Sequence, residues 1–492
     1  MLTFLIALAS LILGYVFYGA FVEKIFAPDD RETPAVAHPD DVDFVPMEPW
    51  RIFLIQVLNI AGLSPIFGAL SGALWGPAVY FWIVFGAIFA GAVHDYLSGM
   101  ISERNNGASI SETVGIYLGP SVKTAARVFT VVMLVLVGTT FSTSPAEFLA
   151  MISPSSSLDV NFWLVVILTY YFLATLLPID KLIGNLYPLF GAALLVMCVG
   201  VGGGIFINGC DMPEIWDNFA NLHPNGLPIW PLMFVTVSCG AISGFHATQS
   251  PIMARCITSE RQGRRIFYGA MIAEGVVALV WAAAGVSVYN GTGGLLTAMN
   301  AGGLSNLVYE ICVKLLGPIG GELALLGVVA CPITSGDTAF RSARLTVADW
   351  YKIDQKSNGK RLMLTMPLLM AGAALSQFNF QIIWRYFAWS NQTLAMIVLW
   401  SAAVYMARHK MNFWVAAIPA VFLSAVSCTY ILVAGEGFSP AIARMLCDGA
   451  QPEGANLLEV ASSVAYPVGI IFAAMCFIVF YYKSVRPMRE SF

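Results

Sequence analysis

The sequence predicts an all-α protein that crosses a lipid bilayer many times. Of its 492 residues, 58% are hydrophobic and only 11% are charged, whereas an average soluble domain carries about 25% charged residues. The apolar residues also form long blocks, each close to the roughly 20 residues that a helix needs to span the hydrocarbon core. Thirteen candidate spans result, at residues 3–24, 51–75, 78–101, 125–150, 160–178, 183–207, 229–252, 265–289, 317–343, 362–377, 381–407, 413–434 and 463–482.

The composition excludes several other classes of protein. A net charge of −4 without a basic stripe argues against nucleic-acid binding. The nine cysteines are scattered and never form a CxxC pair, which is typical of small buried hydrophobes rather than disulfides or metal ligands. Hydrolase, nucleotide-binding and haem motifs are also missing from the sequence. We therefore expect no enzyme and no cofactor, and an ion gradient as the only source of energy.

The distribution of basic residues predicts the orientation of the spans. Residues 1–26 lack a basic start and a small-residue cleavage site, so we interpret them as a retained helix rather than a signal peptide. With the N-terminus outside and thirteen crossings, 22 of the 25 Lys and Arg residues fall on the cytoplasmic side, where such residues accumulate. Only Lys314, Arg385 and Arg444 then lie outside. The C-terminus is predicted to be cytoplasmic.

Two spans are predicted to be broken near mid-membrane depth. They read QVLNIAGLSPIFGALSGALWGP (56–77) and TVSCGAISGFHATQSPIMARC (236–256), with Gly, Ser and Pro at their centres. A backbone group freed there costs several kcal/mol unless protein or a wet cavity satisfies it. One such segment alone is compatible with a kinked packing helix. Two at corresponding positions are typical of a transporter whose solute binds between them.

The positions of the two breaks indicate an inverted repeat. They lie about 180 residues apart, and five spans begin in each interval, which forces the two units into opposite orientations. We therefore predict a 5+5 inverted repeat with one helix before it and two after it. The predicted units are an N-terminal helix and loop (1–50), two repeats (51–208 and 209–412) and C-terminal helices (413–492).

Three carboxylates lie within predicted spans, where insertion of a charge costs at least about 2.5–3.5 kcal/mol. Asp95 and Glu274 occupy similar places in the spans that follow the two breaks. Each either pins its helix to the facing broken span or takes part in ion coupling. Asp337 either serves the coupling ion or forms an i,i+4 ion pair with Arg341.

The remaining polar residues of the spans supply the other candidate sites. The run ACPITSGDTAFRSARLTVADW (330–350) places several oxygen ligands together, which suits sodium, and its carboxylate suits a proton. The predicted ion-coupling residues are Ala61, Asp95, Glu274, Thr334, Ser335, Asp337 and Thr338, of which the last four are the candidate sodium ligands. The predicted solute-binding residues are Ala61, Gly62, Ser64, Ser243, Gly244, His246, Thr248, Gln249, Asn391 and Gln392.

Five segments together resemble the carbon starvation, CstA-type, transporter family. They are IAGLSP (60–65), FGAIFAGAVHDYLSGMISERNNGASISE (85–112), CGAISGFHATQS (239–250), DTAFRSARL (337–345) and SNQTLAM (390–396), in order over about 340 residues. The resemblance implies secondary transport across a bacterial inner membrane, a LeuT-like fold, and peptides or pyruvate as substrates, with proton coupling for the pyruvate carriers. The family's motifs match Ala61, Gly62, Pro65, Asp95, Ser243, Gly244, Phe245, His246, Ser335, Asp337, Thr338, Asn391 and Gln392.

One departure from the family pattern concerns coupling. Larger relatives carry a His-His pair just ahead of the first break, where this chain has Ile55 and Gln56, and at 492 residues the chain resembles the family's short branch.

The expected function is ion-coupled import, driven by protons or sodium, of a small carboxylate-bearing nutrient such as pyruvate or a short peptide during carbon starvation. The expected partners are this solute and the lipid bilayer, and no oligomeric state follows from the sequence. A sodium-coupled amino-acid symporter is the first alternative. A membrane nutrient sensor is the second, although only about ten residues follow the last predicted span.

Overall fold

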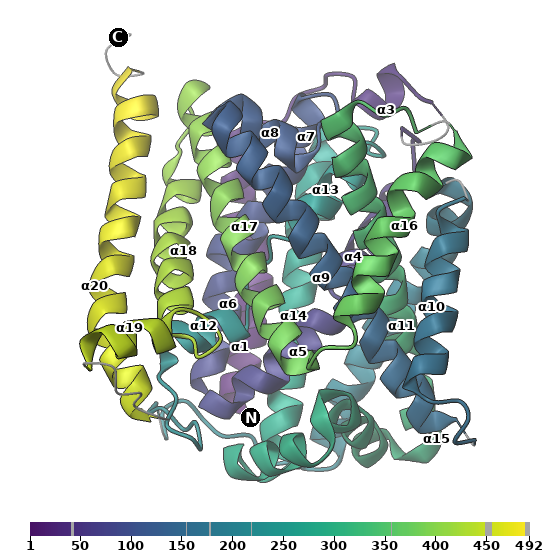
Figure 1. Ribbon diagram of the computed structural model, residues 1–492, viewed down its shortest axis with the longest axis vertical. Coiled ribbons are helices and arrows are strands. Elements are labelled where there is room, and N and C mark those ends of the chain that lie inside the picture. Colours follow the sequence, from purple (N-terminus) through teal and green to yellow (C-terminus); the bar gives the residue numbers. More distant parts are fainter. Residues whose placement is uncertain are drawn as a thin grey trace.

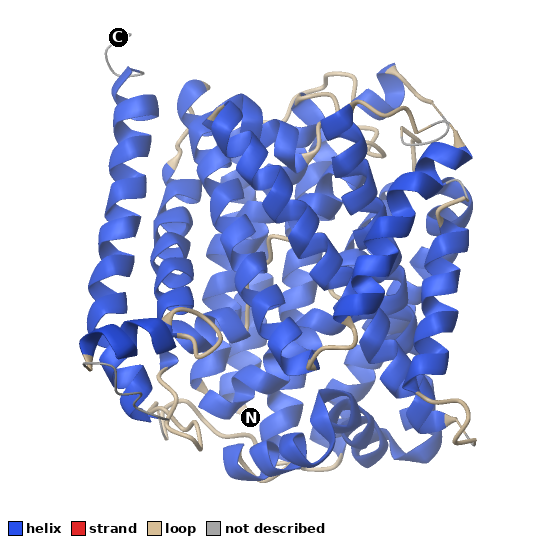
Figure 2. Ribbon diagram, in the orientation of Figure 1, coloured by secondary structure: helices blue, strands red, loops and turns tan. Residues whose placement is uncertain are grey.

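The computed structural model is a bundle of helices that stand side by side (Figures 1 and 2). It describes residues 1–40, 44–153, 155–176, 179–217, 219–355, 357–447 and 455–487, and within these ranges it contains no strand. The N-terminal helices are α1 (Leu2–Leu13), η1 (Gly14–Gly19), α2 (Ala20–Phe26) and α3 (Pro34–Ala37). The C-terminal helices are α18 (Trp414–Val433), α19 (Ser439–Leu446), α20 (Ala455–Phe480) and η7 (Tyr481–Val485).

Two stretches of chain between these ends form the body of the bundle. The first contains α4 (Pro49–Ile60), α5 (Leu63–Gly72), η2 (Ala73–Trp75), α6 (Ala78–Gly86), η3 (Ala87–Gly91), α7 (Ala92–Arg104), α8 (Ile110–Leu118), α9 (Pro120–Ile152), α10 (Val160–Ala174) and α11 (Ile179–Ile207). The second contains η4 (Ile229–Met233), α12 (Phe234–Thr236), α13 (His246–Ala254), η5 (Glu260–Gln262), η6 (Arg264–Tyr268), α14 (Gly269–Val288), α15 (Thr292–Tyr351), α16 (Asn358–Leu375) and α17 (Phe380–Arg408).

The prediction of a multi-pass membrane protein is confirmed. Within the described residues, seven helices are long and apolar enough to cross a membrane, and the bent pair α4 and α5 makes an eighth candidate. Large apolar side chains such as Phe17, Val199 and Ile470 are exposed on the outside of the bundle, as is typical of helices that face lipid. Fewer spans than thirteen meet this criterion, because several expected spans contain breaks or polar runs. All nine cysteines are free thiols.

The first break lies where the sequence predicts it. Helix α4 ends at Ile60, and α5 begins at Leu63 after a bend of 47°. Ala61 and Gly62 both leave helical geometry, Gly62 with ψ −139°. Pro65 follows in the first turn of α5, where its missing N–H removes no intrahelical hydrogen bond.

The second break also falls within the span in which the sequence predicts it. Helix α12 ends at Thr236 and α13 begins at His246, so residues 237–245 form the non-helical segment. Gly240 adopts φ +94°, a conformation that favours glycine. His246, Thr248 and Gln249 form the first turn of α13, directly after this segment.

Helix α15 and the segments outside the expected spans differ from the sequence prediction. Helix α15 is non-helical at Gly303 and Gly317, both with φ +73°, so the span expected at 317–343 begins directly after Gly317. The helical segments at 292–316 and helix α19 were not expected, because their windows are too short or too polar for a membrane span. A short helix, α8, also lies between the spans expected at 78–101 and 125–150.

The second break leaves no room for a side chain at Gly244. A Cβ there would lie 2.3 Å from the Asn391 carbonyl oxygen and 2.6 Å from the Ala395 nitrogen. We expect Gly244→Ala to lower the free energy of unfolding by about 1–3 kcal/mol, as overpacking does elsewhere, measured as a lower Tm in detergent. The control is Gly293→Ala, where no atom lies within 4 Å of the added Cβ. Equal Tm values for the two variants would contradict this packing.

Candidate functional site

Four titratable side chains form a continuous buried chain beside the second break. Asp95 links two imidazoles: its Oδ1 lies 2.8 Å from His94 Nδ1, and its Oδ2 lies 2.8 Å from His246 Nδ1. On the other side of the ring, His246 Nε2 lies 3.2 Å from Glu274 Oε2, a contact without hydrogen-bond geometry. Glu274 Oε1 accepts a hydrogen bond from the Gly240 N–H at 3.0 Å. All four side chains are fully buried.

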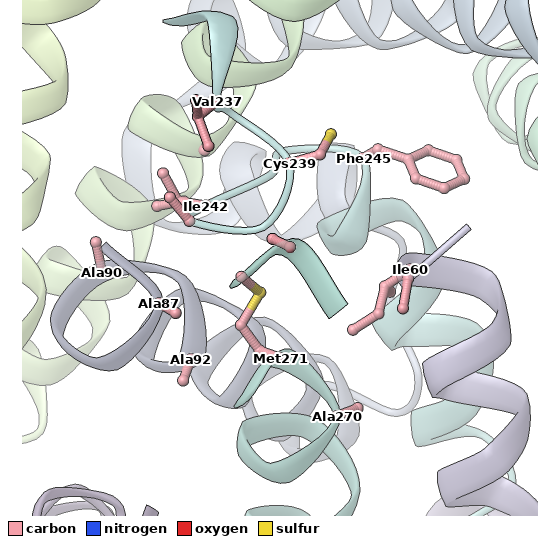
Figure 3. Close-up of a cluster of buried hydrophobic side chains, with 14 of the residues drawn as sticks. Ile60, Ala87, Ala90, Ala92, Val237, Cys239, Ile242, Phe245, Ala270 and Met271 are labelled. Carbon is pink, nitrogen blue, oxygen red and sulfur yellow. The ribbon is translucent and has the colours of Figure 1, made fainter. Parts of the chain in front are cut away.

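The chain joins three helices and the break. Helix α7 carries His94 and Asp95, α13 begins at His246, α14 carries Glu274, and Gly240 belongs to the break itself. Apolar side chains that neighbour these residues in sequence, including Ala92, Ile242 and Met271, pack around the same region (Figure 3). Their burial excludes water, which strengthens every electrostatic interaction inside the cluster.

This arrangement has a direct consequence for protons. With both imidazoles neutral, Asp95 and Glu274 would place two negative charges in an apolar interior, which is energetically costly. A proton on His246 compensates one of them, and the interacting groups then titrate as a unit. The cluster can therefore take up and release protons. Glu274 also holds the break through Gly240, and its role in ion coupling stays a prediction.

The first break contacts α15 through Ser335. The Ser335 hydroxyl lies 3.3 Å from the Leu58 carbonyl oxygen and 3.4 Å from that of Asn59. A Cβ at Gly62 would lie 3.2 Å from the same hydroxyl. The hydroxyls of Thr334 and Thr338 donate to α15's own carbonyls, those of Cys331 and Ser335. Hydroxyl and carbonyl oxygens thus meet where Ala61 and Gly62 interrupt the helix.

Asp337 contacts a residue one turn further along α15. Its Oδ2 lies 3.4 Å from Arg341 Nη2, so the i,i+4 ion pair that the spacing allows is present. Arg341 also donates to the Ala174 carbonyl of α10 at 3.2 Å. Ser335 and Asp337, two residues apart on one helix, point in different directions, and a shared ion-coupling role for them stays a prediction.

Asn391 and Gln392 fasten α17 to the second break. Asn391 Oδ1 accepts hydrogen bonds from the Phe245 N–H at 2.6 Å and the Ser243 hydroxyl at 3.1 Å. The Asn391 carbonyl accepts from the Gly244 N–H at 3.1 Å. Gln392 Nε2 donates to the Phe234 carbonyl at 2.7 Å, just ahead of the break. In this conformation both amides hold the backbone, and their role in solute binding stays a prediction.

The other predicted solute-binding residues are buried on the two helices that follow the breaks. Ser64 lies in α5. The Thr248 hydroxyl donates to the Phe245 carbonyl at 2.7 Å and accepts from Gln249 Nε2 at 2.9 Å. This commits the amide nitrogen of Gln249 and leaves its buried Oε1 without a hydrogen-bond partner. Gln249 thus carries a free acceptor in the first turn of α13.

Sequence reasoning missed two further groups of polar residues. In α4, Gln56 Nε2 donates to the Ser250 hydroxyl at 3.2 Å, and both amide atoms of buried Asn59 have no hydrogen-bond partner. In α9, the hydroxyls of Thr140 and Ser144 are buried and equally without one. Buried polar groups are nearly always satisfied by protein or water, so these atoms indicate a region that water or solute completes. The run GTTFSTSP (138–145) in a predicted span was the signal available for α9.

A metal site does not emerge from these contacts. Among the residues that the structure describes, no group of three or more His, Cys, Asp or Glu side chains is arranged to hold a metal ion. The buried chain at His246 is a series of pairwise contacts, which suits a shared proton better than a coordinated metal.

Comparisons with known proteins identify the family. The family described as carbon starvation protein CstA matches residues 1–167 and 149–302. The chain belongs to this family. A membrane protein of Haemophilus influenzae is 42% identical over 352 residues, which cover 61% of this chain and 95% of that protein. The peptide transporter CstA of Escherichia coli is 24% identical over 569 residues, covering 87% of this chain and 80% of that one.

A further relative and two solved structures complete the comparison. The pyruvate/proton symporter BtsT of Escherichia coli is 28% identical over 336 residues, covering 55% of this chain and 46% of that one. The Eremococcus coleocola manganese transporter superposes with a TM-score of 0.54 at 11% identity, over 92% and 99% of the two chains. MhsT, solved in complex with L-phenylalanine, superposes with a TM-score of 0.54 at 14% identity, covering 86% of this chain and 98% of that one. The fold is thus that of LeuT-like transporters, and the expectation of a transporter family rather than an enzyme family is confirmed.

The hydrogen bonds of Asn391 predict a structural effect of its removal. We expect Asn391→Ala to lower the free energy of unfolding by about 1–3 kcal/mol, because the buried Phe245 N–H loses its acceptor. Asn391→Asp keeps that acceptor oxygen and should recover part of the loss. The measurement is the Tm of purified protein in detergent, with exposed Gln377→Ala as the control. An unchanged Tm for Asn391→Ala would show that the break is held by other contacts.

Proposed function

We propose that the protein is a proton-coupled secondary transporter that imports a small carboxylate-bearing nutrient, pyruvate or a short peptide. The observation that carries this proposal is the buried contact of His246 with both Asp95 and Glu274. It joins a proton-binding cluster directly to the backbone of the second break. The peptide transporter and the pyruvate/proton symporter among the relatives support the same class of solute.

Protonation of the cluster would change how the second break is held. A protonated His246 attracts Asp95 and Glu274, and this attraction holds the start of α13 against α7 and α14. Loss of the proton leaves two carboxylates in a dry interior, which favours separation of these helices or entry of water. The proton thereby shifts the equilibrium between two arrangements of α13, one packed against α7 and α14 and one separated from them. A solute bound at the break shifts the same equilibrium.

We also propose the membrane arrangement that this mechanism needs. Thirteen crossings in a bacterial inner membrane, with the N-terminus outside and the C-terminus cytoplasmic, account for the distribution of 22 of 25 basic residues. Two inverted units of five spans place the breaks at 61–62 and 237–245 in corresponding positions. Alternating access then follows from movement of one group of helices against the rest around the breaks.

A second candidate function is a sodium-coupled amino-acid symporter. The favouring observation is the position of the Ser335 hydroxyl beside the Leu58 and Asn59 carbonyls at the first break, with Thr338 one turn away. Hydroxyl and carbonyl oxygens are the ligands that hard cations prefer. Asp337 is not needed for this site, because its carboxylate is paired with Arg341.

Substitutions in the buried chain test the leading proposal. We expect Asp95→Asn, Glu274→Gln and His246→Gln each to reduce proton-driven uptake of labelled pyruvate or Ala-Ala into liposomes by about 5- to 150-fold, the range of a coupling free energy of about 1–3 kcal/mol. Exchange of solute without a gradient should survive better than gradient-driven uptake. The control is Glu310→Gln, a partly exposed acid that contacts Tyr289 and Asn306. Normal uptake by all three variants would restrict these residues to a structural role.

The choice of coupling ion is decided by gradients imposed one at a time. We expect a proton gradient alone to drive uptake, and Ser335→Ala and Thr338→Ala to retain most of it, because neither residue contacts the His246 cluster in the structure. Uptake that requires sodium, fails in both of these variants and persists in Asp337→Asn would overturn proton coupling and support the second candidate.

A further inference from the structure

A large cavity opens at the ends of both broken spans, away from the His246 cluster. Its volume is about 1070 Å³, and its wall includes Ser71 near the end of α5, Trp75 of η2, Thr236 at the end of α12, and Trp384 of α17. The loop that contains His223 also lines it. This loop belongs to the connection 208–228, whose Glu214 binds the Met1 amino group. The cavity therefore lies toward the N-terminal face of the bundle, the lower face in Figure 1.

The cavity wall carries an ion pair whose two side chains differ in exposure. Arg385 Nη1 lies 3.3 Å from Glu436 Oε2, with side-chain exposures of 55% for Arg385 and 12% for Glu436. Two tyrosines hold the acid: the Tyr430 hydroxyl donates to Glu436 Oε1 at 2.8 Å, and the Tyr386 hydroxyl donates to its carbonyl at 2.7 Å. A guanidinium has five N–H donors, so Arg385 can bind a second carboxylate beside this pair.

The charges of the wall select between kinds of solute. Among the lining residues that the structure describes, Arg385 is the one Lys or Arg, whereas Glu436 and Glu459 contribute two carboxylates. A solute with only a carboxylate would gain Arg385 but meet two like charges. A zwitterion places its carboxylate on Arg385 and its ammonium on Glu436, so both charges of the wall stay paired. Trp75 and Trp384 offer aromatic surface to apolar side chains of the same solute.

We propose that this cavity is a second solute site that captures zwitterions such as short peptides before they reach the breaks. Arg385 binds the solute carboxylate, Glu436 binds the ammonium, and Tyr430 and Tyr386 position Glu436. The proposal rests on the proposed function, because capture matters only if the protein transports such a solute. Under the predicted orientation this face is external, and Arg385 is one of only three basic residues on it.

The test measures binding by equilibrium dialysis of purified protein in detergent, with labelled Ala-Ala, its C-terminal amide and its N-acetyl derivative as probes. Arg385→Gln should weaken Ala-Ala binding about fivefold, the size expected for one solvent-accessible ion pair, and should remove the preference for Ala-Ala over its amide. Glu436→Gln should likewise remove the preference for Ala-Ala over its N-acetyl derivative. Arg385→Lys should restore part of the affinity.

The control is Lys314→Gln, which removes a basic residue of the same predicted face that does not line the cavity. Its affinities should equal those of the wild type. An Arg385→Gln variant with unchanged affinity for all three probes, or a wild type that binds none of them, would overturn the cavity site. Ala-Ala binding that responds to Arg385, without gradient-driven uptake of any solute, would overturn the proposed function and leave the cavity site standing.

Discussion

The position of the His246 imidazole between two buried carboxylates constrains the rest of this structure. An unpaired charge in a dry, membrane-embedded interior costs several kcal/mol, so Asp95 and Glu274 need a partner that they can both reach. His246 meets both because it is the first residue of α13, where the chain resumes a helix after the second break. A shift of α7, α13 or α14 relative to the others therefore also separates His246 from one of its two carboxylate partners.

Pairing of buried polar groups also explains how both interruptions of the helices are tolerated. Several backbone groups near the breaks meet a polar side chain from a facing helix. Glu274 accepts from the Gly240 N–H, Asn391 accepts from the Phe245 N–H, and the Ser335 hydroxyl lies against the carbonyls ahead of the first break. Backbone at this depth must be satisfied by protein or by a wet cavity. The side chains that anchor the breaks include Glu274, Ser335 and Asn391, which the sequence predicts as ion-coupling or solute-binding residues.

Much of this arrangement could be predicted because it depends on local properties of the chain. Hydropathy marks the spans, Gly, Ser and Pro mark the breaks, and the scarcity of charge singles out Asp95, Glu274 and Asp337. The burial of all three acids follows from the same reasoning and is observed. Asp337 shows where such reasoning ends. It pairs with Arg341 while Ser335, two residues earlier, faces the first break, and packing of α15 against its neighbours decides which side each takes.

The sequence by itself determined that this is a polytopic membrane protein of the CstA family with two interrupted spans, because hydropathy, composition and motifs are read along the chain. Only the tertiary structure decided that Asp95 meets His246, 151 residues away, and that His246 meets Glu274. Nothing in the local sequence pattern distinguishes a histidine that only fills space in the core from one that contacts two carboxylates. That distinction arises when α7, α13 and α14 pack together, since pairing of buried charge is a property of the assembled bundle.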